Sequence, residues 1–520
     1  MTATAHPEVE QQQPQRAVPR WQAAAAGLLA AVAALAAAEV VAALLDGAGS
    51  PVTAIGTAVI NLAPVALKDA AIALLGTADK PALIGGVLLV LAIVAAVTGV
   101  LAVRRFWQGA AGVVLLGVVG LGAVLADASA GVASLLPSFV AVITGVAALH
   151  VLVSALTGTT GEPAPDRRRF LLAAGAVGAS AAVGGGVARW LVANRRAAVA
   201  ASAVRLPAAD QALPPVPDGA SLQVDGLTPF ITPNDDFYRI DTALRAPTIA
   251  VDDWRLKITG MVDNPMEVTY DQLLEYELVE ADITLACVSN EVGGDLIGNA
   301  RWRGVRMADL LEDARVQSGA DQLVGRAVDG FTTGSPLETV LDGRESLIAI
   351  GMNGEPLPRL HGFPARIVVP GLYGYVSATK WLAELELTTF DAFDAYWVPR
   401  GWAERAPIKT QSRIDVPSAM TDVRTGPQTV AGVAWAQGRG IARVEVQVDG
   451  GPWEEAQLAE AVGKDTWRQW AYQWQATQGA HQLRVRATDE MGETQPEERV
   501  APRPDGATGW HTVAVSVTAA

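Results

Sequence analysis

The chain has 520 residues, of which 50% are hydrophobic and 18% are charged, and its mean hydropathy is +0.26. A soluble chain carries about 25% charged residues, so this composition indicates a membrane portion and excludes a disordered or collagen-like chain. The single cysteine excludes a disulfide-stapled scaffold. The net charge of −15 excludes nucleic acid as an expected partner, because the phosphates would be repelled.

The charge is distributed unevenly along the chain. Residues 1–205 contain 13 basic and 9 acidic residues, a net charge of +4, whereas residues 206–520 contain 26 and 45, a net charge of −19. The first part is also rich in Ala, Leu, Val and Gly. A membrane anchor followed by a large acidic soluble module explains both properties.

Five apolar stretches in the first part reach the ~20 residues that an α-helix needs to cross a ~30 Å hydrocarbon layer. They are residues 21–45, 81–103, 106–126, 137–157 and 170–192. The second, third and fourth contain no charged residue, and the first contains only Glu39. The alternative, buried helices of a soluble core, does not require uncharged runs of this length. The sequence therefore predicts a membrane anchor over 21–193, preceded by a cytoplasmic tail at 1–20.

Arginines orient the predicted helices, because they precede the first stretch, separate the second from the third and precede the fifth. These residues are Arg16, Arg20, Arg104, Arg105 and Arg167–Arg169. Loops rich in Arg and Lys stay in the cytoplasm. An odd number of spans then places everything after residue 193 on the extracytoplasmic side of a cytoplasmic membrane, although Arg195 and Arg196 oppose this orientation.

The last basic cluster has a second interpretation. Arg167-Arg168-Arg169-Phe170-Leu171 is followed by a weakly hydrophobic Ala/Gly run, and this pattern resembles the twin-arginine signal that exports folded proteins. The alternative is a cluster that only fixes the topology. A folded, cofactor-loaded domain downstream favours the export signal.

The acidic module contains two kinds of pattern. A Pro/Ala-rich linker at 194–218 leads to residues 219–400, where short strand-like and helical patterns are mixed, as is typical of an α+β domain. Farther along, polar and apolar residues alternate over 443–448, and regular short strands separated by turns predict an immunoglobulin-like β-sandwich over 401–520. The predicted fold is multi-domain: a transmembrane helical bundle, an α+β domain and a sandwich.

Cys287 is the only cysteine, and it lies between a strand-like stretch and a polar turn, Val288-Ser289-Asn290. Three interpretations are open: an inert buried thiol, a nucleophile, or a ligand to a soft metal. A nucleophile would need a nearby histidine, and only His361 lies in the same predicted domain. A metal would need further donors, which a cofactor could supply.

Several motifs follow one another around and after Cys287. They are Thr284–Asn290, Gly298–Leu311, Gly351–Pro358, His361–Gly371 and Lys380–Leu382. In this order and spacing they resemble the sulfite oxidase family of molybdenum enzymes. The resemblance covers residues 219–520 and implies a molybdopterin-binding α+β domain, followed by a molybdenum-cofactor dimerisation domain with the immunoglobulin-like fold.

The resemblance implies a role for Cys287 and for Arg301. Cys287 matches the thiolate that binds molybdenum, whose other sulfur donors come from the molybdopterin dithiolene; a thiolate is a soft ligand suited to a redox metal. Arg301 matches an arginine beside the metal, and a guanidinium is a natural bidentate partner for an oxyanion such as sulfite. The alternative for Arg301 is an ordinary structural ion pair.

The resemblance also implies a set of cofactor-binding residues from three segments. These are Asn234, Tyr238 and Arg239 near the start of the domain, His361 and Arg366 in the His-Gly-Phe-Pro-x-Arg segment, and Ser377, Thr379 and Lys380 in the loop that follows it. Arg366 is expected to contact the pterin phosphate. For the first segment the alternatives are a turn formed by Asn and Asp and a buried aromatic residue.

Two departures from the family pattern concern the substrate. Arg239-Ile240-Asp241 stands where many sulfite oxidases have Arg-Asn-His, and Phe331, next to Thr332 in the expected substrate pocket, stands where the family has a tyrosine. The resemblance implies oxidation of sulfite or a related small anion by oxygen-atom transfer, and these departures leave open the alternative of a sulfoxide or other oxo-acceptor reductase. A non-enzymatic, membrane-anchored binding module is the third hypothesis.

The sequence offers no second redox centre. It has no Cys-x-x-Cys-His motif for haem, one cysteine cannot ligate an iron–sulfur cluster, and His150 is the only histidine in a predicted span. We therefore expect a molybdenum–molybdopterin cofactor alone and a separate redox partner, either a cytochrome or a quinone-linked membrane protein. A homodimer through 401–520 is also expected from the resemblance.

Overall fold

The structure is a computed structural model of the chain. It describes residues 18–45, 50–64, 79–126, 132–157, 167–201, 205–244, 246–419 and 421–519. The chain forms two compact units, Met1–Ala198 and Val199–Ala520, and each is described by itself. Most of the predicted cytoplasmic tail lies outside the described residues.

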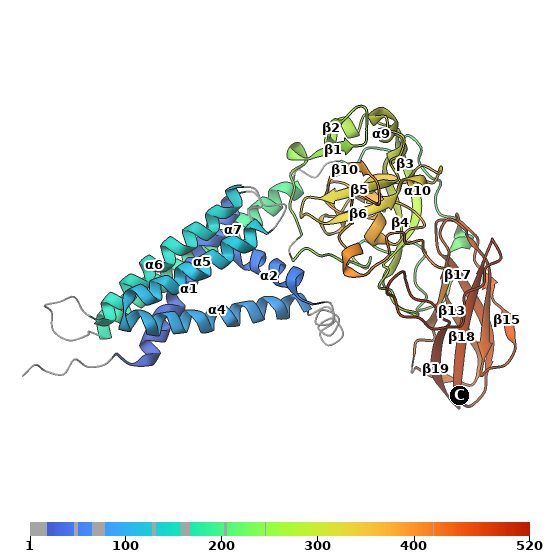
Figure 1. Ribbon diagram of the computed structural model, residues 1–520. Helices are drawn as coiled ribbons and strands as arrows, with labels where there is room; N and C mark the ends of the chain where they lie inside the picture. Colours follow the sequence, from blue (N-terminus) through green and yellow to red (C-terminus); the bar gives the residue numbers. More distant parts are fainter. Residues whose placement is uncertain are drawn as a thin grey trace, which may run out of the picture. The chain divides into compact units, whose positions relative to one another are not determined.

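The described residues of the first unit form helices and short connections between them (Figure 1). Its helices are α1 (Arg20–Leu44), α2 (Pro51–Leu62), α4 (Asp79–Arg104), α5 (Phe106–Leu125), α6 (Leu136–Thr157) and α7 (Arg167–Ala201), with a short 3₁₀ turn at Val132–Leu135. Five of these described helices, all except α2, are long and apolar enough to cross a membrane. The five predicted stretches correspond to them in order, but α7 continues eight residues into the predicted linker at 194–218.

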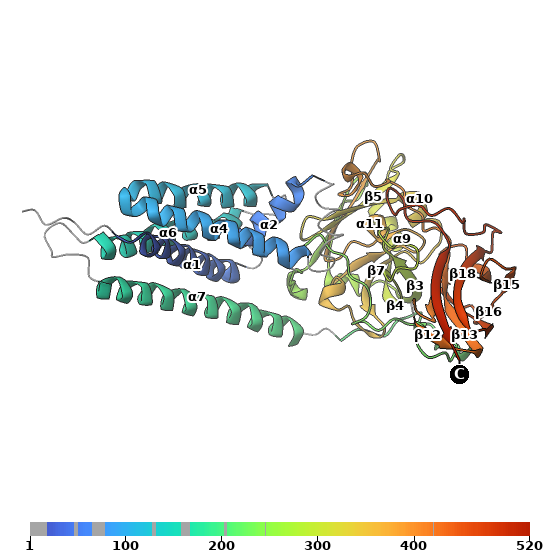
Figure 2. The same cartoon turned by 90° about the horizontal axis from the view of Figure 1, so that it is seen from below.

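Small residues let the helices of this unit approach closely. A Cβ added to Gly27 on α1 would lie 1.9 Å from the carbonyl oxygen of Ala95 on α4, and one added to Gly99 would lie 2.2 Å from that of Ala23. Only glycine permits such contact between helix backbones. Figure 2 shows α7 running alongside α1, where Gly184 faces Ala36.

The second unit begins with an α+β domain that contains two mixed or antiparallel sheets. One sheet has the order β2 (Met266–Thr269), β1 (Arg255–Gly260), β10 (Leu382–Thr388), β5 (Gln322–Ala327), β6 (Thr332–Pro336). The other has the order β3 (Leu278–Ala286), β4 (Ile297–Arg306), β7 (Leu347–Met352), β8 (Glu355–Pro356), with β9 (Arg366–Val368) on β7. The short helices α8 (Tyr270–Leu273), α9 (Met307–Ala314), α10 (Leu337–Val340) and α11 (Gly374–Ser377) connect these strands.

The end of the chain forms two β-sheets packed face to face. One has the order β11 (Gln411–Val416), β13 (Gly426–Trp435), β17 (Arg468–Ala476), β16 (Gln457–Leu458); the other has the order β12 (Asp422–Arg424), β19 (His511–Thr518), β18 (Gly479–Asp489), β14 (Ile441–Val448), β15 (Trp453–Glu455). Alternating apolar residues of both sheets, such as Val444, Val446, Trp470 and Val515, form a common core. The two-sheet arrangement agrees with the predicted sandwich, and its immunoglobulin-like label stays a prediction.

The sandwich is joined to the α+β domain by buried hydrogen bonds centred on Thr284 of β3. Its backbone N–H donates to Asp465 O (2.9 Å), its carbonyl accepts from Gln437 Nε2 (3.0 Å), and its hydroxyl accepts from the Trp467 backbone N–H (2.7 Å). The Trp467 indole N–H also donates to Phe230 O (2.8 Å). The strand that leads to Cys287 is therefore held by both parts of the unit.

Candidate active site

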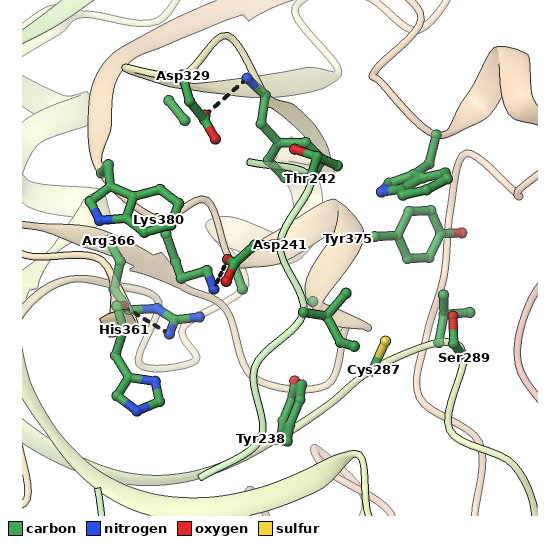
Figure 3. A pocket seen from close by; sticks show the side chains of 18 of the residues that line it. Tyr238, Asp241, Thr242, Cys287, Ser289, Asp329, His361, Arg366, Tyr375 and Lys380 are labelled. Atoms are coloured by element: carbon green, nitrogen blue, oxygen red, sulfur yellow. Dashed lines mark hydrogen bonds and ion pairs between the residues drawn. The ribbon is translucent and has the colours of Figure 1, made fainter. Parts of the chain in front are cut away.

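A cavity of about 900 Å³, measured out to its mouth, opens where β3 ends and where the segment before β1, the β5–β6 loop and the segments after β9 and β10 converge. Of the predicted site residues, Tyr238, Cys287, Phe331, His361, Arg366 and Lys380 line it. Figure 3 shows the Cys287 sulfur pointing into this space between Tyr238, Tyr375 and Ser289.

Cys287 is held rigidly at the end of β3. Its backbone N–H donates to Leu296 O (2.9 Å), and its carbonyl accepts from Asn290 N–H (3.0 Å), which closes the polar turn expected after the strand. The Asn290 side chain accepts from Leu296 N–H (2.9 Å) and fixes the turn. Burial raises the pKa of the thiol, so it stays protonated until a metal replaces the proton.

His361 is a neutral imidazole in this site. Burial lowers its pKa to about 4, and the positive charge of Arg366 acts in the same direction. Its Nε2 lies 2.8 Å from the carbonyl oxygen of Asn234, which requires the proton to be on Nε2. The imidazole also packs edge-on against Phe237, with ring centroids 5.7 Å apart.

Arg366 is a buried cation that lacks a carboxylate partner within the described part of the chain. Its guanidinium donates to the carbonyl oxygens of His361 (3.1 Å) and Ile367 (3.4 Å) and lies 4.9 Å from the centre of the Trp302 ring. Burial lowers its pKa to about 10. A buried guanidinium with only neutral partners is a ready site for an anionic group such as a phosphate.

Lys380 supplies a second buried cation. It forms an ion pair with Asp241, and its ammonium group lies 5.2 Å from the centre of the Trp381 ring. Burial lowers its pKa to about 8, while Asp241 acts in the opposite direction. Figure 3 shows Asp241 reaching Lys380 from the segment that follows Tyr238. Arg366 and Lys380 therefore place two positive charges in the cavity that holds the thiol.

Arg301 does not line this cavity. Its guanidinium donates two hydrogen bonds to Asp282, at 2.9 and 2.8 Å, and the two residues are direct partners across β3 and β4. Its third contact is with the Leu213 carbonyl oxygen (3.5 Å). The structure thus places Arg301 in the ion pair that was its alternative interpretation, and its predicted place beside the metal is not reproduced.

Three other predicted residues, Asn234, Ser377 and Thr379, support the cavity from behind or from its edge. Asn234 positions His361 through its carbonyl and accepts from Asn353 Nδ2 (2.8 Å) through its side chain. Ser377 is buried and donates to Tyr373 O (3.0 Å), and the hydroxyls of Thr379 and Thr333 lie 2.7 Å apart.

Thr332 and Arg239 complete the predicted set. The Thr332 hydroxyl accepts from the Tyr396 backbone N–H (3.0 Å) and is buried behind the neighbouring Phe331. Arg239 is exposed, yet its charge contributes to the lowered pKa of both His361 and Lys380. Arg239 therefore lies close enough to influence the cavity electrostatically although it is not part of its wall.

An aromatic wall and two acidic residues of the site were not predicted from the sequence. Tyr375, Trp397 and Trp402 line the cavity together with Phe331, and their rings contact one another, with centroids 5.8 Å apart for Tyr375 and Trp402. Asp241 and Asp329 also line it. The density of aromatic residues between positions 390 and 402 is the one signal in the sequence that could have revealed this wall.

The fold and the cavity define a molybdopterin-binding oxidoreductase, and comparison with known proteins agrees. Residues 243–397 match the oxidoreductase molybdopterin binding domain, and residues 405–518 match the Mo-co oxidoreductase dimerisation domain. The chain belongs to the sulfite oxidase family of molybdopterin-dependent oxidoreductases.

Individual relatives cover different parts of the chain. Rat mitochondrial sulfite oxidase is 31% identical over an alignment of 342 residues, gaps included, that covers 55% of this chain and 62% of that protein. An uncharacterized oxidoreductase of Bacillus subtilis, YuiH, is 36% identical over 29% of this chain and 73% of its own length. The structure of the sulfane dehydrogenase SoxCD from Paracoccus pantotrophus is 25% identical and covers 55% of this chain and 81% of that one, with a TM-score of 0.49.

Proposed function

We propose that this protein is a membrane-anchored molybdopterin enzyme that transfers an oxygen atom to or from a small substrate. The observation that carries the proposal is the cavity in which one thiol, Cys287, lies with the buried cations Arg366 and Lys380 and the neutral His361. This donor set fits a pterin cofactor that carries a soft metal and a phosphate, because each end of such a group meets the side chain that its chemistry requires.

Each residue is assigned a part in holding the cofactor. Cys287 would ligate molybdenum and give up its proton on binding. Arg366 and Lys380 would bind the phosphate, for which Asp241 must leave Lys380. Tyr238 would contact the pterin through its neutral hydroxyl, and His361 would do so through its unprotonated Nδ1, which can only accept a hydrogen bond. The bound cofactor supplies a metal that can exchange an oxygen atom and two electrons with the substrate.

For a small anion such as sulfite, the positive charge must come from a residue other than Arg301. Arg239 is the candidate, since it is exposed and acts electrostatically on the cavity, whereas Arg301 is committed to Asp282. We therefore propose that Arg239, and not Arg301, binds an anionic substrate.

A neutral, sulfoxide-type substrate is the second candidate. The aromatic wall formed by Phe331, Tyr375, Trp397 and Trp402 supports it, because aromatic faces bind polarisable, uncharged groups and offer no charge to an oxyanion. The two candidates differ in how they depend on the Arg239 charge: binding of an anion should need it, and binding of a neutral sulfoxide should not.

We further propose that α1, α4, α5, α6 and α7 anchor the enzyme in the cytoplasmic membrane with residues after 193 on the extracytoplasmic side. The cluster at Arg167–Arg169 is proposed as the export signal. Electrons would pass to or from a separate cytochrome or quinone-linked protein, and the domain at 401–520 would form a homodimer. The matched dimerisation domain supports the last point.

Metal and pterin analysis tests the proposal. Full-length protein from a cofactor-competent host should contain one molybdenum and one pterin per chain, and absence of both would favour a non-enzymatic binding module. A substrate panel then separates the two candidates: Arg239→Gln should raise KM for sulfite about tenfold, as expected for one lost charged contact. Arg424→Gln, an exposed arginine on β12, is the matched control. An unchanged KM for sulfite together with turnover of a sulfoxide would establish the second candidate.

A further inference from the structure

The helical unit encloses a cavity of its own, with a volume of about 750 Å³ measured out to its openings. Residues of α1, α2, α4, α5 and α6 line it, and nearly all of them are apolar. Small residues line much of this space, among them Ala30, Ala31 and Ala34 on α1 and Gly120 on α5, where an added Cβ would have ordinary clearance. In a bundle placed in a membrane, only a molecule that dissolves in the hydrocarbon layer can reach such a cavity.

Two hydroxyl groups face this cavity, and they differ in their bonding. Thr98 on α4 donates to the carbonyl oxygen of Ala95 at 2.8 Å, so it is satisfied by its own helix. Ser138 on α6 is 1% exposed, and its hydroxyl has no hydrogen-bond partner within the described part of the chain. A buried hydroxyl without a partner is unfavourable, and one that lines a cavity can be satisfied by whatever fills it.

Ser138 lies at one end of the cavity. A Cβ added to Gly120 would lie 3.5 Å from the Ser138 hydroxyl and 3.8 Å from the Pro51 side chain, so these three residues meet at that end. Leu149 lines the cavity three turns farther along α6, about 16 Å away at the rise of an α-helix. The cavity is therefore elongated, with one hydrogen-bond donor at one end and hydrocarbon walls along its length.

We propose that this cavity binds a lipophilic quinone, with a ring carbonyl accepting a hydrogen bond from Ser138 and the apolar tail extending toward Leu149. A phospholipid acyl chain could fill the same space, but its carbonyl acceptors are ester groups beside a charged headgroup, for which the apolar walls provide no partner. A quinone satisfies the hydroxyl and the apolar walls together. The inference goes beyond the oxygen-transfer function and depends only on the membrane placement of the helical unit.

Binding of a decyl-substituted benzoquinone to the full-length protein in detergent tests the inference. Equilibrium dialysis should give saturable binding of one quinone per chain. Ser138→Ala should raise Kd about tenfold, which corresponds to about 1.4 kcal/mol, the strength of one hydrogen bond. Gly120→Leu should abolish saturable binding, because a Cβ at this position has ordinary clearance and the longer side chain extends into the cavity.

Matched controls come from the same unit. Gly122→Leu places the same side chain on α5 where an added Cβ meets nothing within 4 Å, and Ser180→Ala removes an exposed hydroxyl on α7; both should keep the wild-type Kd. As a second measurement, a photoreactive azidoquinone should label peptides of α5 and α6.

Three results would overturn the inference: no saturable binding, the same Kd in Ser138→Ala as in the wild type, or equal displacement of the quinone by a saturated phospholipid. The last result would assign the cavity to an acyl chain. Because the assay uses neither substrate nor turnover, its failure leaves the oxygen-transfer proposal standing. An enzyme without molybdenum would equally leave the quinone site standing.

Discussion

Replacing Arg301 by Gln tests whether this arginine has a structural role or binds the substrate. Its guanidinium donates two hydrogen bonds to Asp282, whose side chain is only 3% exposed. A buried carboxylate that loses its cationic partner destabilises a protein by about 3 kcal/mol. With an unfolding entropy of about 2.1 cal/mol/K per residue over the ~320 residues of the second unit, this corresponds to a fall in Tm of about 4 °C.

Thermal unfolding of the full-length protein in detergent, followed by tryptophan fluorescence, measures this change. The control is the double variant Arg301→Gln/Asp282→Asn, which should recover part of the stability because no unpaired carboxylate remains. KM for sulfite should stay within about twofold of the wild-type value, since Arg301 lies outside the cavity wall. An unchanged Tm with a tenfold higher KM would refute this reasoning and return Arg301 to the substrate site.

Three further predictions concern the thiol, the histidines and the export signal. Cys287→Ser should fold and bind pterin but lose turnover, because an alcohol is a weakly acidic donor to the metal; wild-type activity in this variant would remove Cys287 from the site. Burial lowers the pKa of His361 and His511 to about 4, so as the pH falls both imidazoles are protonated in the unfolded chain before they are protonated in the folded one. The contribution of these residues to the free energy of unfolding should therefore be complete above pH 7 and should decrease from pH 6.5 toward pH 4. His511→Gln, which keeps an acceptor for the Ile414 N–H, should reduce that loss, and an identical urea midpoint at pH 7 and pH 5 would contradict the prediction. In the double variant Arg167→Lys/Arg168→Lys, the second unit should stay in the cytoplasm, because lysine keeps the charge but not the twin-arginine signal. If protease added outside spheroplasts still digests the second unit of this variant, the cluster is only a topology signal.

Most of the helical unit could be predicted because the length of an uncharged apolar run decides whether a helix can span a bilayer. The helices α4, α5 and α6 lie close to the predicted 81–103, 106–126 and 137–157. The end of α7 could not be predicted in this way. Residues 194–201 are polar at first but rich in alanine, the strongest helix former, so the helix continues where composition indicated a linker.

The candidate site divides along similar lines. Cys287, His361, Arg366 and Lys380 belong to motifs whose order could be recognised, and the structure brings them together in one cavity. The environment of Arg301 depends on the pairing of β3 with β4, which sets Asp282 opposite it, and no local pattern in the sequence encodes that register.

Asp241 was missed for a related reason. It lies on an irregular segment whose path is set by contacts with distant residues, in this case by the ion pair with Lys380. Long-range pairing, rather than local propensity, therefore accounts for both failures.

The hydrogen bonds around Thr284 make the position of the thiol a shared property of two segments that look like separate modules. Thr284, three residues before Cys287, is bonded through its backbone to Asp465 and Gln437 and through its hydroxyl to Trp467, and all three residues follow the point where the second family segment begins. Truncation near residue 400 would therefore remove the outer support of the strand that carries the metal ligand, in addition to any dimer contact. A chimaera that takes the segment after residue 400 from a relative must preserve these three contacts with Thr284. The two family segments can therefore be exchanged only together.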